Sequence, residues 1–262
     1  MTALKLTVLG SGTSMGVPSI GCRCRVCLSP EPLDKRTRPS VLLQFDGHNV
    51  VIDTSPDFRQ QVLRAGIQHL DAILFTHGHA DHILGLDDIR PFNLKQKGDI
   101  PVYATAETLA TLRRTFAYIF DSTASLSSLP GVQLNEIRGP LRLLGLEVTP
   151  LEAAHGDMAV LGFRFGRAAY LTDFSSVPEL TRKLLHGLDD FVLDALRHEP
   201  HPMHSNVEQS LALLAEVKPR RAWFTHICHD LPHIETNAAL AGRLPHTQVQ
   251  LAWDGLSFEV AR

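Results

Sequence analysis

The stretch from residue 76 to residue 82 reads Thr76-His77-Gly78-His79-Ala80-Asp81-His82. It follows an apolar run that predicts a strand over 72–75. Alternate residues of an extended chain point the same way, so His77 and His79 are expected to hold one metal ion, and Asp81 and His82 a second ion nearby. A solvated polar loop is the alternative, but four ligand-type side chains in six residues argue against it. Imidazole and carboxylate suit divalent zinc, manganese or iron.

Two ions need more ligands than this stretch supplies, and three later strands are each followed by a side chain of ligand type. These side chains are His155, Asp173 and His226, after strands expected over 146–151, 168–171 and 222–225. Each of them alone is more often a capping or surface residue. Together they predict a metal site along the edge of a sheet where successive strands end.

The rest of the chain alternates strands with helices. Apolar patterns predict further strands over 4–9, 41–45, 50–53, 101–104, 160–165, 191–194 and 249–253. Helical periodicity predicts helices over 56–65, 106–118, 178–186 and 207–217. Ser55 is the expected N-cap of the first helix and Gly66 its stop. Hairpins occur early and in the middle, so we expect mixed sheets packed face to face with helices outside. The stretch 121–131 is expected to be a mobile loop.

The composition is typical of a soluble globular protein, with 44% hydrophobic and 20% charged residues in a chain of 262. No break in composition divides the chain, so we expect one domain over residues 1–262. The formal net charge of -3 argues against a surface coated in positive charge for nucleic acid. We find neither signal-peptide features nor an apolar run long enough to span a membrane. A cytoplasmic location is therefore expected.

Three of the four cysteines lie in the run Cys22-Arg23-Cys24-Arg25-Val26-Cys27. Their spacing is too tight for ordinary disulfides within the run, and the expected compartment is reducing. Three thiolates supply three of the four ligands that a structural zinc site needs. His229 and Cys228 are both candidates for the fourth ligand, and the residues alone leave that choice open.

The run Thr76–His82, with a His, an Asp and a His at later strand ends, resembles the metallo-β-lactamase superfamily of hydrolases. The resemblance implies a four-layer αβ/βα sandwich of two mixed β-sheets with a dinuclear metal site at its upper edge. It implies a first ion held by His77, His79 and His155, a second held by Asp81, His82 and His226, and Asp173 bridging both. It also implies that Asp53 accepts the second N–H of a metal ligand. Helix capping is the alternative role for Asp53.

The glycine-rich loop after the first strand, the cysteine run and the late Thr225-His226-Ile227-Cys228-His229 closely resemble the PhnP-type phosphodiesterases. These bacterial enzymes open 5-phosphoribosyl 1,2-cyclic phosphate. The resemblance implies a homodimer, and it implies a structural Cys₃His zinc completed by His229. It further implies that a hydroxide bridging the two metal ions attacks a cyclic or small phosphodiester.

The same resemblance implies a general acid, His204, that protonates the leaving oxygen. His204 and the metal ligand Asp81 are therefore the expected catalytic residues. His198 and His201 compete for the acid role but are expected at the surface. Arg90 follows the metal run and can clamp a substrate phosphate; an ion pair with a neighbouring aspartate is the alternative.

Three other functions remain open. A tRNA 3′-processing nuclease resembles this chain in the metal run, but such enzymes hold tRNA with a basic arm that we do not find here. A PqqB-like, metal-binding protein shares the cysteine run, but the PqqB family does not keep the full set of dinuclear ligands. A lactonase or thiolesterase is possible because a bridging hydroxide also attacks carbonyl carbon.

Overall fold

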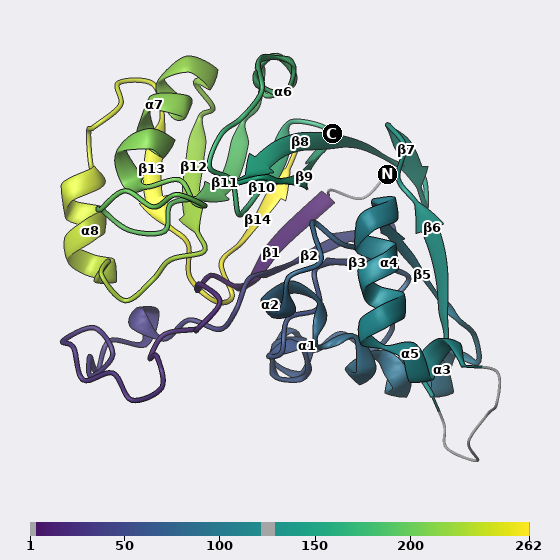
Figure 1. Ribbon diagram of the computed structural model, residues 1–262. Coiled ribbons are helices and arrows are strands. Elements are labelled where there is room, and N and C mark those ends of the chain that lie inside the picture. Colours follow the sequence, from purple (N-terminus) through teal and green to yellow (C-terminus); the bar gives the residue numbers. More distant parts are fainter. Residues whose placement is uncertain (1–3, 122–128, 262) are drawn as a thin grey trace.

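The computed structural model describes residues 4–121 and 129–261 (Figure 1). The strands are β1 Leu4–Gly10, β2 Ser40–Phe45, β3 His48–Ile52, β4 Ala72–Leu74, β5 Ile100–Ala104, β6 Val132–Glu136, β7 Leu141–Leu143, β8 Leu146–His155, β9 Met158–Phe165, β10 Ala168–Leu171, β11 Asp190–Asp194, β12 Arg221–Thr225, β13 Gln248–Leu251 and β14 Ser257–Val260. The α-helices are α1 Phe58–Ala65, α2 Ala80–Ile83, α3 Arg90–Gln96, α4 Ala106–Thr115, α5 Ala117–Phe120, α6 Glu179–Leu184, α7 Val207–Val217 and α8 His233–Leu240. Two short 3₁₀ helices are η1 Pro32–Asp34 and η2 Leu86–Ile89. Across the described ranges, no helix is long and apolar enough to cross a membrane.

The strands form two seven-stranded mixed sheets. The order is β14-β1-β2-β3-β4-β5-β6 in the first sheet and β13-β12-β11-β10-β9-β8-β7 in the second. Hairpin-type antiparallel pairs occupy one part of each sheet, and β3 to β6 and β10 to β13 are parallel in the rest. In Figure 1 the helices α1 to α5 lie on the side of the first sheet and α6 to α8 on the side of the second.

Three apolar clusters explain the layers. The inner faces of both sheets meet in one cluster, where Val8 of the first sheet packs with Phe163 and Tyr170 of the second. The outer face of the first sheet packs on α1 and α4 in another, and the outer face of the second sheet packs on α7 in a third. Each fully buried large side chain contributes about 1.5–3 kcal/mol. The result is the four-layer αβ/βα sandwich that the sequence predicts.

One edge of this sandwich carries the chemically interesting side chains. The parallel strands end there, and so does β8, which is antiparallel to β9 and therefore runs the same way as β10. Asp53, Asp173 and His226 each follow such a strand and adopt positive φ angles of 64°, 54° and 56°. Non-glycine residues seldom adopt this left-handed conformation, and where they do not lie in turns or at helix ends they often mark functional sites. These three residues turn the chain sharply where the strands end.

Two predicted helices were wrong in their bounds. The first helix begins at Phe58 rather than residue 56, and Ser55 does not cap it. Ser55 Oγ instead accepts from the N–H of Asp57, whose carboxylate is held by the Arg38 guanidinium at 3.0 Å.

The helix expected over 106–118 breaks at Phe116, where φ is -110° and ψ is 42°. Gly66 ends the first helix as predicted, with φ of 66°. Residues 122–128 of the loop expected over 121–131 lie outside the described residues.

Candidate metal centre

Three histidines form a first cluster at this edge. One ring nitrogen each from His77, His79 and His155 lies within 4.8 Å of the others. His155 donates its Nδ1–H to the carbonyl oxygen of Met203 at 2.6 Å, which leaves Nε2 as a free acceptor. Burial lowers the pKa of all three rings, and that of His77 most. The three imidazoles are therefore neutral near pH 7, which is the form that binds a metal ion.

Two carboxylates and two histidines form a second cluster beside the first. One atom each from Asp81, His82, Asp173 and His226 lies within 4.8 Å of the others. Asp81 and His82 lie on the short helix α2, so the metal stretch turns helical where its second pair of ligand types begins. Asp173 Oδ2 lies 3.3 Å from His226 Nε2 and 4.0 Å from His77 Nε2, so this carboxylate reaches both clusters.

The charges of the second cluster are strongly coupled. Burial alone would lower the pKa of His226, but the carboxylates of Asp173, Asp81 and Asp194 raise it to about 9. Burial alone would raise the pKa of Asp173, but the neighbouring His226 and His82 hold it well below the ordinary value. Without an ion, protons on the histidines balance the carboxylates.

Buried side-chain atoms without a hydrogen-bond partner indicate whether metal ions fit the two clusters. Among the described residues, five buried atoms of the clusters have no hydrogen-bond partner: Nε2 of His77 and His82, Nδ1 and Nε2 of His226, and Oδ2 of Asp81. Leaving a buried polar atom unpaired costs about 1–3 kcal/mol. Cations coordinated by the three Nε2 atoms and by Oδ2 of Asp81 would remove that cost for these four atoms, and nitrogen and carboxylate oxygen are suitable donors for zinc, manganese and iron. The residues present therefore fit divalent metal ions.

Asp53 lies beneath the metal stretch and is fully buried. Its carboxylate accepts from the backbone N–H and the hydroxyl of Thr76, both at 2.8 Å. It also accepts the Nδ1–H of His82 at 2.7 Å, so His82 keeps Nε2 for the cluster. Asp53 does not cap α1, whose N-cap is Asp57. The contact with His82 is the one that the resemblance implies.

His204 lies over both clusters. Its ring is 4.6 Å from the ring of His155 and stacks on that of His226 at 4.7 Å. Its Nδ1 bonds the fully buried carboxylate of Asp194 at 3.0 Å. The sequence reasoning missed Asp194, although it also ends a strand, β11, at the same edge. The rule that predicted Asp173 and His226 applies equally to Asp194 and could have found it.

The other histidines near His204 have different surroundings. His201 lies with its ring 5.1 Å from that of His204, and its Nδ1 accepts from the N–H of Met203. His198 is exposed. Arg90 is the first residue of α3 and is exposed, and it belongs to neither cluster. Burial raises the pKa of Asp88, and Arg90 opposes that rise, so the guanidinium lies near this aspartate.

A third cluster contains the cysteine run. The Sγ atoms of Cys22, Cys24 and Cys27 lie 3.2, 3.5 and 3.4 Å from Nδ1 of His229. Cys228 is not part of this cluster, and its thiol donates to a carboxylate oxygen of Asp230 at 3.1 Å. The N–H of Cys27 is the main cause that lowers the pKa of Cys24 to about 7. Three sulfurs and one imidazole in this arrangement suit a closed zinc site.

His226 and His229 are only three residues apart but belong to different clusters. Between them, the N–H of Ile227 donates to the carbonyl of Ser11 at 3.0 Å, and its carbonyl accepts from the N–H of Thr13 at 3.0 Å. This pairing holds the glycine-rich loop after β1, residues 10–16, between the second cluster and the cysteine cluster. The positions of both clusters therefore depend on the same short segment.

A family model described as the beta-lactamase superfamily domain matches residues 48–227, which include all seven members of the two histidine–aspartate clusters. The chain belongs to the beta-lactamase superfamily. Within it, a solved diphosphatase from the PhnP family is 49% identical, with a TM-score of 0.90 and 98% of each chain covered. The chain is thus a PhnP-like member of this superfamily with the metallo-β-lactamase fold.

Two further proteins resemble this chain. PqqB from Methylobacterium extorquens, solved with Zn²⁺ bound, is 22% identical with a TM-score of 0.81, covering 98% of this chain and 100% of that one. That likeness shows the shared fold. An octanoyltransferase from Porphyromonas gingivalis is 36% identical over 257 residues, or 97% of this chain. The chain spans about half (51%) of that protein's length.

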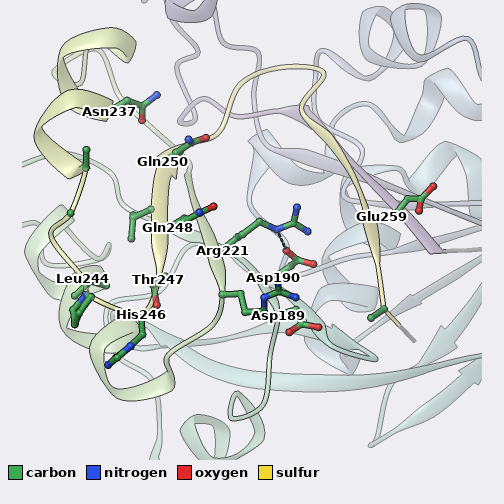
Figure 2. A pocket seen from close by; sticks show the side chains of 16 residues that line it. Asp189, Asp190, Arg221, Asn237, Leu244, His246, Thr247, Gln248, Gln250 and Glu259 are labelled. Atoms are coloured by element: carbon green, nitrogen blue, oxygen red, sulfur yellow. Dashed lines mark hydrogen bonds and ion pairs between the residues drawn. The ribbon is translucent and has the colours of Figure 1, made fainter.

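A separate cavity of about 880 Å³ opens beside β13 (Figure 2). Figure 2 shows Arg221 paired with Asp190, whose carboxylate accepts from Nε of that arginine at 2.7 Å. The guanidinium of Arg221 also lies 5.2 Å from the ring centre of Trp223. No member of the clusters described above lines this cavity. It is therefore distinct from the candidate metal centre.

Proposed function

We propose that the protein is a metal-dependent phosphodiesterase that hydrolyses a cyclic or small phosphodiester. One observation carries the proposal: His204, bonded to the buried Asp194, lies directly over two clusters that suit divalent ions. Two ions without an acid can activate water, but they leave a departing alkoxide unprotonated. The identity of 49% to a PhnP-family diphosphatase supports a phosphoryl substrate.

Each cluster has a separate task in this proposal. His77, His79 and His155 hold one divalent ion, Asp81, His82 and His226 hold the other, and Asp173 reaches both. When bound, such a pair of ions supplies a nucleophilic hydroxide and positive charge for the phosphoryl oxygens. Asp53 fixes the ring of His82. The cysteine cluster holds a structural zinc and thereby keeps the segment after β12 in place.

His204 acts on the leaving oxygen. Because its Nδ1 is bonded to Asp194, the proton that it transfers is carried on Nε2. As the P–O bond breaks, this proton moves to the leaving oxygen and completes an alcohol. The Asp194 carboxylate fixes the tautomer and the orientation of the ring and stabilises its protonated form, and the ring regains a proton from water after each turnover. A positioned acid of this kind contributes about 10²–10⁴-fold to the rate.

The test is a panel of substrates with the purified protein loaded in turn with zinc, manganese or iron. The panel contains cyclic and linear phosphodiesters, a nucleoside diphosphate, a tRNA precursor and an aryl carboxylic ester as the carbonyl control. We expect the highest kcat/KM on a small or cyclic phosphodiester. A higher kcat/KM on the carbonyl ester, or no phosphodiester hydrolysis with two metal ions bound, would contradict the proposal.

A further inference from the structure

The glycine-rich loop after β1 has no part in the proposed mechanism, but it lies against the segment that carries a metal ligand. Its first residues pass between residues 36–38 and residues 226–228. A Cβ at Gly10 would overlap the carbonyl oxygen of Arg38, and a Cβ at Gly12 would lie 3.0 Å from the carbonyl oxygen of Arg36. Glycine at both positions therefore lets the three segments lie this close together.

The residue between these two glycines, Ser11, contacts the segment around His226. Its carbonyl oxygen accepts from the N–H of Ile227 at 3.0 Å. On the other side of His226, the carbonyl oxygen of Thr225 accepts from the N–H of Ala195 at 3.1 Å. His226 has a left-handed φ of 56°, a conformation that persists only where neighbouring contacts hold it. Ser11 supplies one of these contacts, so a shift of Ser11 would move His226.

Asp254 holds Ser11 in place. It lies in the turn between β13 and β14, and its side chain is only 8% exposed. Oδ1 accepts from the N–H and from the hydroxyl of Ser11, both at 2.9 Å. Oδ2 accepts from the N–H of Thr37 at 2.9 Å and from its hydroxyl at 2.5 Å, and lies 3.3 Å from Nη1 of Arg64. Within the described part of the chain, these five donor groups fix the carboxylate, which in turn joins the two segments.

We propose that Asp254 is a positioning residue for the second metal ion and acts through Ser11 and Ile227 on His226. This role rests on the proposed function, in which His226 is a ligand of that ion. Asp254 belongs to neither metal cluster, so it acts by fixing where Nε2 of His226 points. The glycine-rich loop is then the connection between the turn after β13 and the metal centre.

An amide at residue 254 cannot replace the carboxylate. Each carboxylate oxygen accepts from a backbone N–H, one from Ser11 and the other from Thr37. In Asp254→Asn, one of these N–H groups must face the amide NH₂ group and lose its acceptor. The Arg64 guanidinium lies on the Thr37 side and favours the remaining oxygen there, so the amide nitrogen faces Ser11. The variant keeps the size of the side chain and removes the contact that holds Ser11.

The test loads the protein with Cd²⁺ and follows each bound ion separately by cadmium NMR, because the position of a cadmium resonance depends on the atoms that bind the ion. Asp81→Ala identifies the resonance of the second ion, and a competing chelator then measures each affinity. In Asp254→Asn we expect the resonance of the second ion to move and its affinity to fall about tenfold, whereas the affinity for the first ion changes by less than about threefold.

Two further variants make the result specific. Asp71→Asn is the matched control, because Asp71 Oδ2 also accepts from a backbone N–H, that of Asn49 at 2.7 Å, at the end of β3 away from Asp53. It should leave the affinities for both ions unchanged. Ser11→Ala removes one of the five donor groups and keeps the backbone contact, so it should weaken binding of the second ion by about threefold.

An equal loss of affinity for both ions in Asp254→Asn, or no loss in this variant, would overturn the positioning role and leave the proposed function intact. If Asp254→Asn does not fold, Ser11→Ala decides: a loss confined to the second ion supports the role, and an unchanged affinity overturns it. A wild-type protein that binds Cd²⁺ at neither histidine–aspartate cluster would contradict the proposed function and the positioning role together.

Discussion

Replacing His204 with alanine separates proton transfer from every other part of the proposed mechanism. The variant removes a ring that is stacked on His226 and bonded to Asp194, but it leaves all seven members of the two metal clusters in place. The effect should therefore depend on how much the leaving oxygen needs a proton. An alkoxide leaving group needs one, whereas p-nitrophenolate departs readily without it.

The expected fall in kcat/KM of His204→Ala follows from the geometry of the ring. His204 Nδ1 lies 3.0 Å from a carboxylate that is fully buried, so the ring is held in one orientation as a general acid requires. With an alkoxide leaving group we expect kcat/KM to fall by about 10²–10⁴-fold. That range corresponds to about 3–5 kcal/mol of transition-state stabilisation. With p-nitrophenolate we expect a fall of less than about tenfold.

The assay compares a nucleoside 2′,3′-cyclic phosphate with bis(p-nitrophenyl) phosphate, at equal metal content for each variant. His201→Ala is the matched control, because it removes a neighbouring histidine ring that has no part in the proposed proton transfer. The His201 ring lies 5.1 Å from that of His204. It should change kcat/KM for neither ester by more than about threefold. Asp194→Asn should show the pattern of His204→Ala to a smaller extent. Equal losses on both esters in His204→Ala would refute the acid role, since a residue that only binds substrate does not distinguish leaving groups.

Other predictions concern the metal sites. Asp53→Asn removes the charged acceptor of the ring of His82 and should weaken Zn²⁺ binding about 10–100-fold in a chelator competition, whereas the remote control Asp190→Asn should not. Unchanged affinity in Asp53→Asn would contradict that role. Because the pKa of His226 is raised to about 9 without metal, its proton must leave when an ion binds. Affinity at the second cluster should therefore rise at least about tenfold per pH unit between pH 7 and 9 and then level off; a flat titration would refute this. Cys27→Ser should lose one zinc per chain and several degrees of Tm, and an unaltered metal content and Tm would exclude a zinc at that cluster.

Much of this site could be predicted from the sequence because its members follow strands. The apolar runs before residues 76, 173 and 226 set where each strand ends, and parallel strands place those ends at one edge. Asp53 followed from resemblance to the superfamily, and its contact with His82 lies where that resemblance implies. Residue type and local pattern were sufficient for the positions after the strands, whereas the role of Asp53 needed the resemblance.

Other features depend on contacts between distant segments. Asp194 becomes functionally interesting only because the loop after β11 folds back and places His204 on it. The choice between Cys228 and His229 depends on the direction of each side chain after β12, which no local pattern encodes. The late start of α1 has a similar cause, because Arg38 holds the carboxylate of Asp57. The close approach of Gly78 to Thr111 of α4 is another such contact, which the sequence does not reveal.

We propose that two divalent ions, joined by Asp173, carry out phosphodiester hydrolysis. Asp173 contacts both clusters, with Oδ1 3.4 Å from His82 Nε2 and Oδ2 3.3 Å from His226 Nε2 and 4.0 Å from His77 Nε2. The most direct test is therefore Asp173→Ala, with metal content and kcat/KM for bis(p-nitrophenyl) phosphate measured on the same sample. We predict the loss of at least one ion from the two clusters and a fall of at least about a hundredfold in kcat/KM. Wild-type turnover by Asp173→Ala would contradict the dinuclear mechanism.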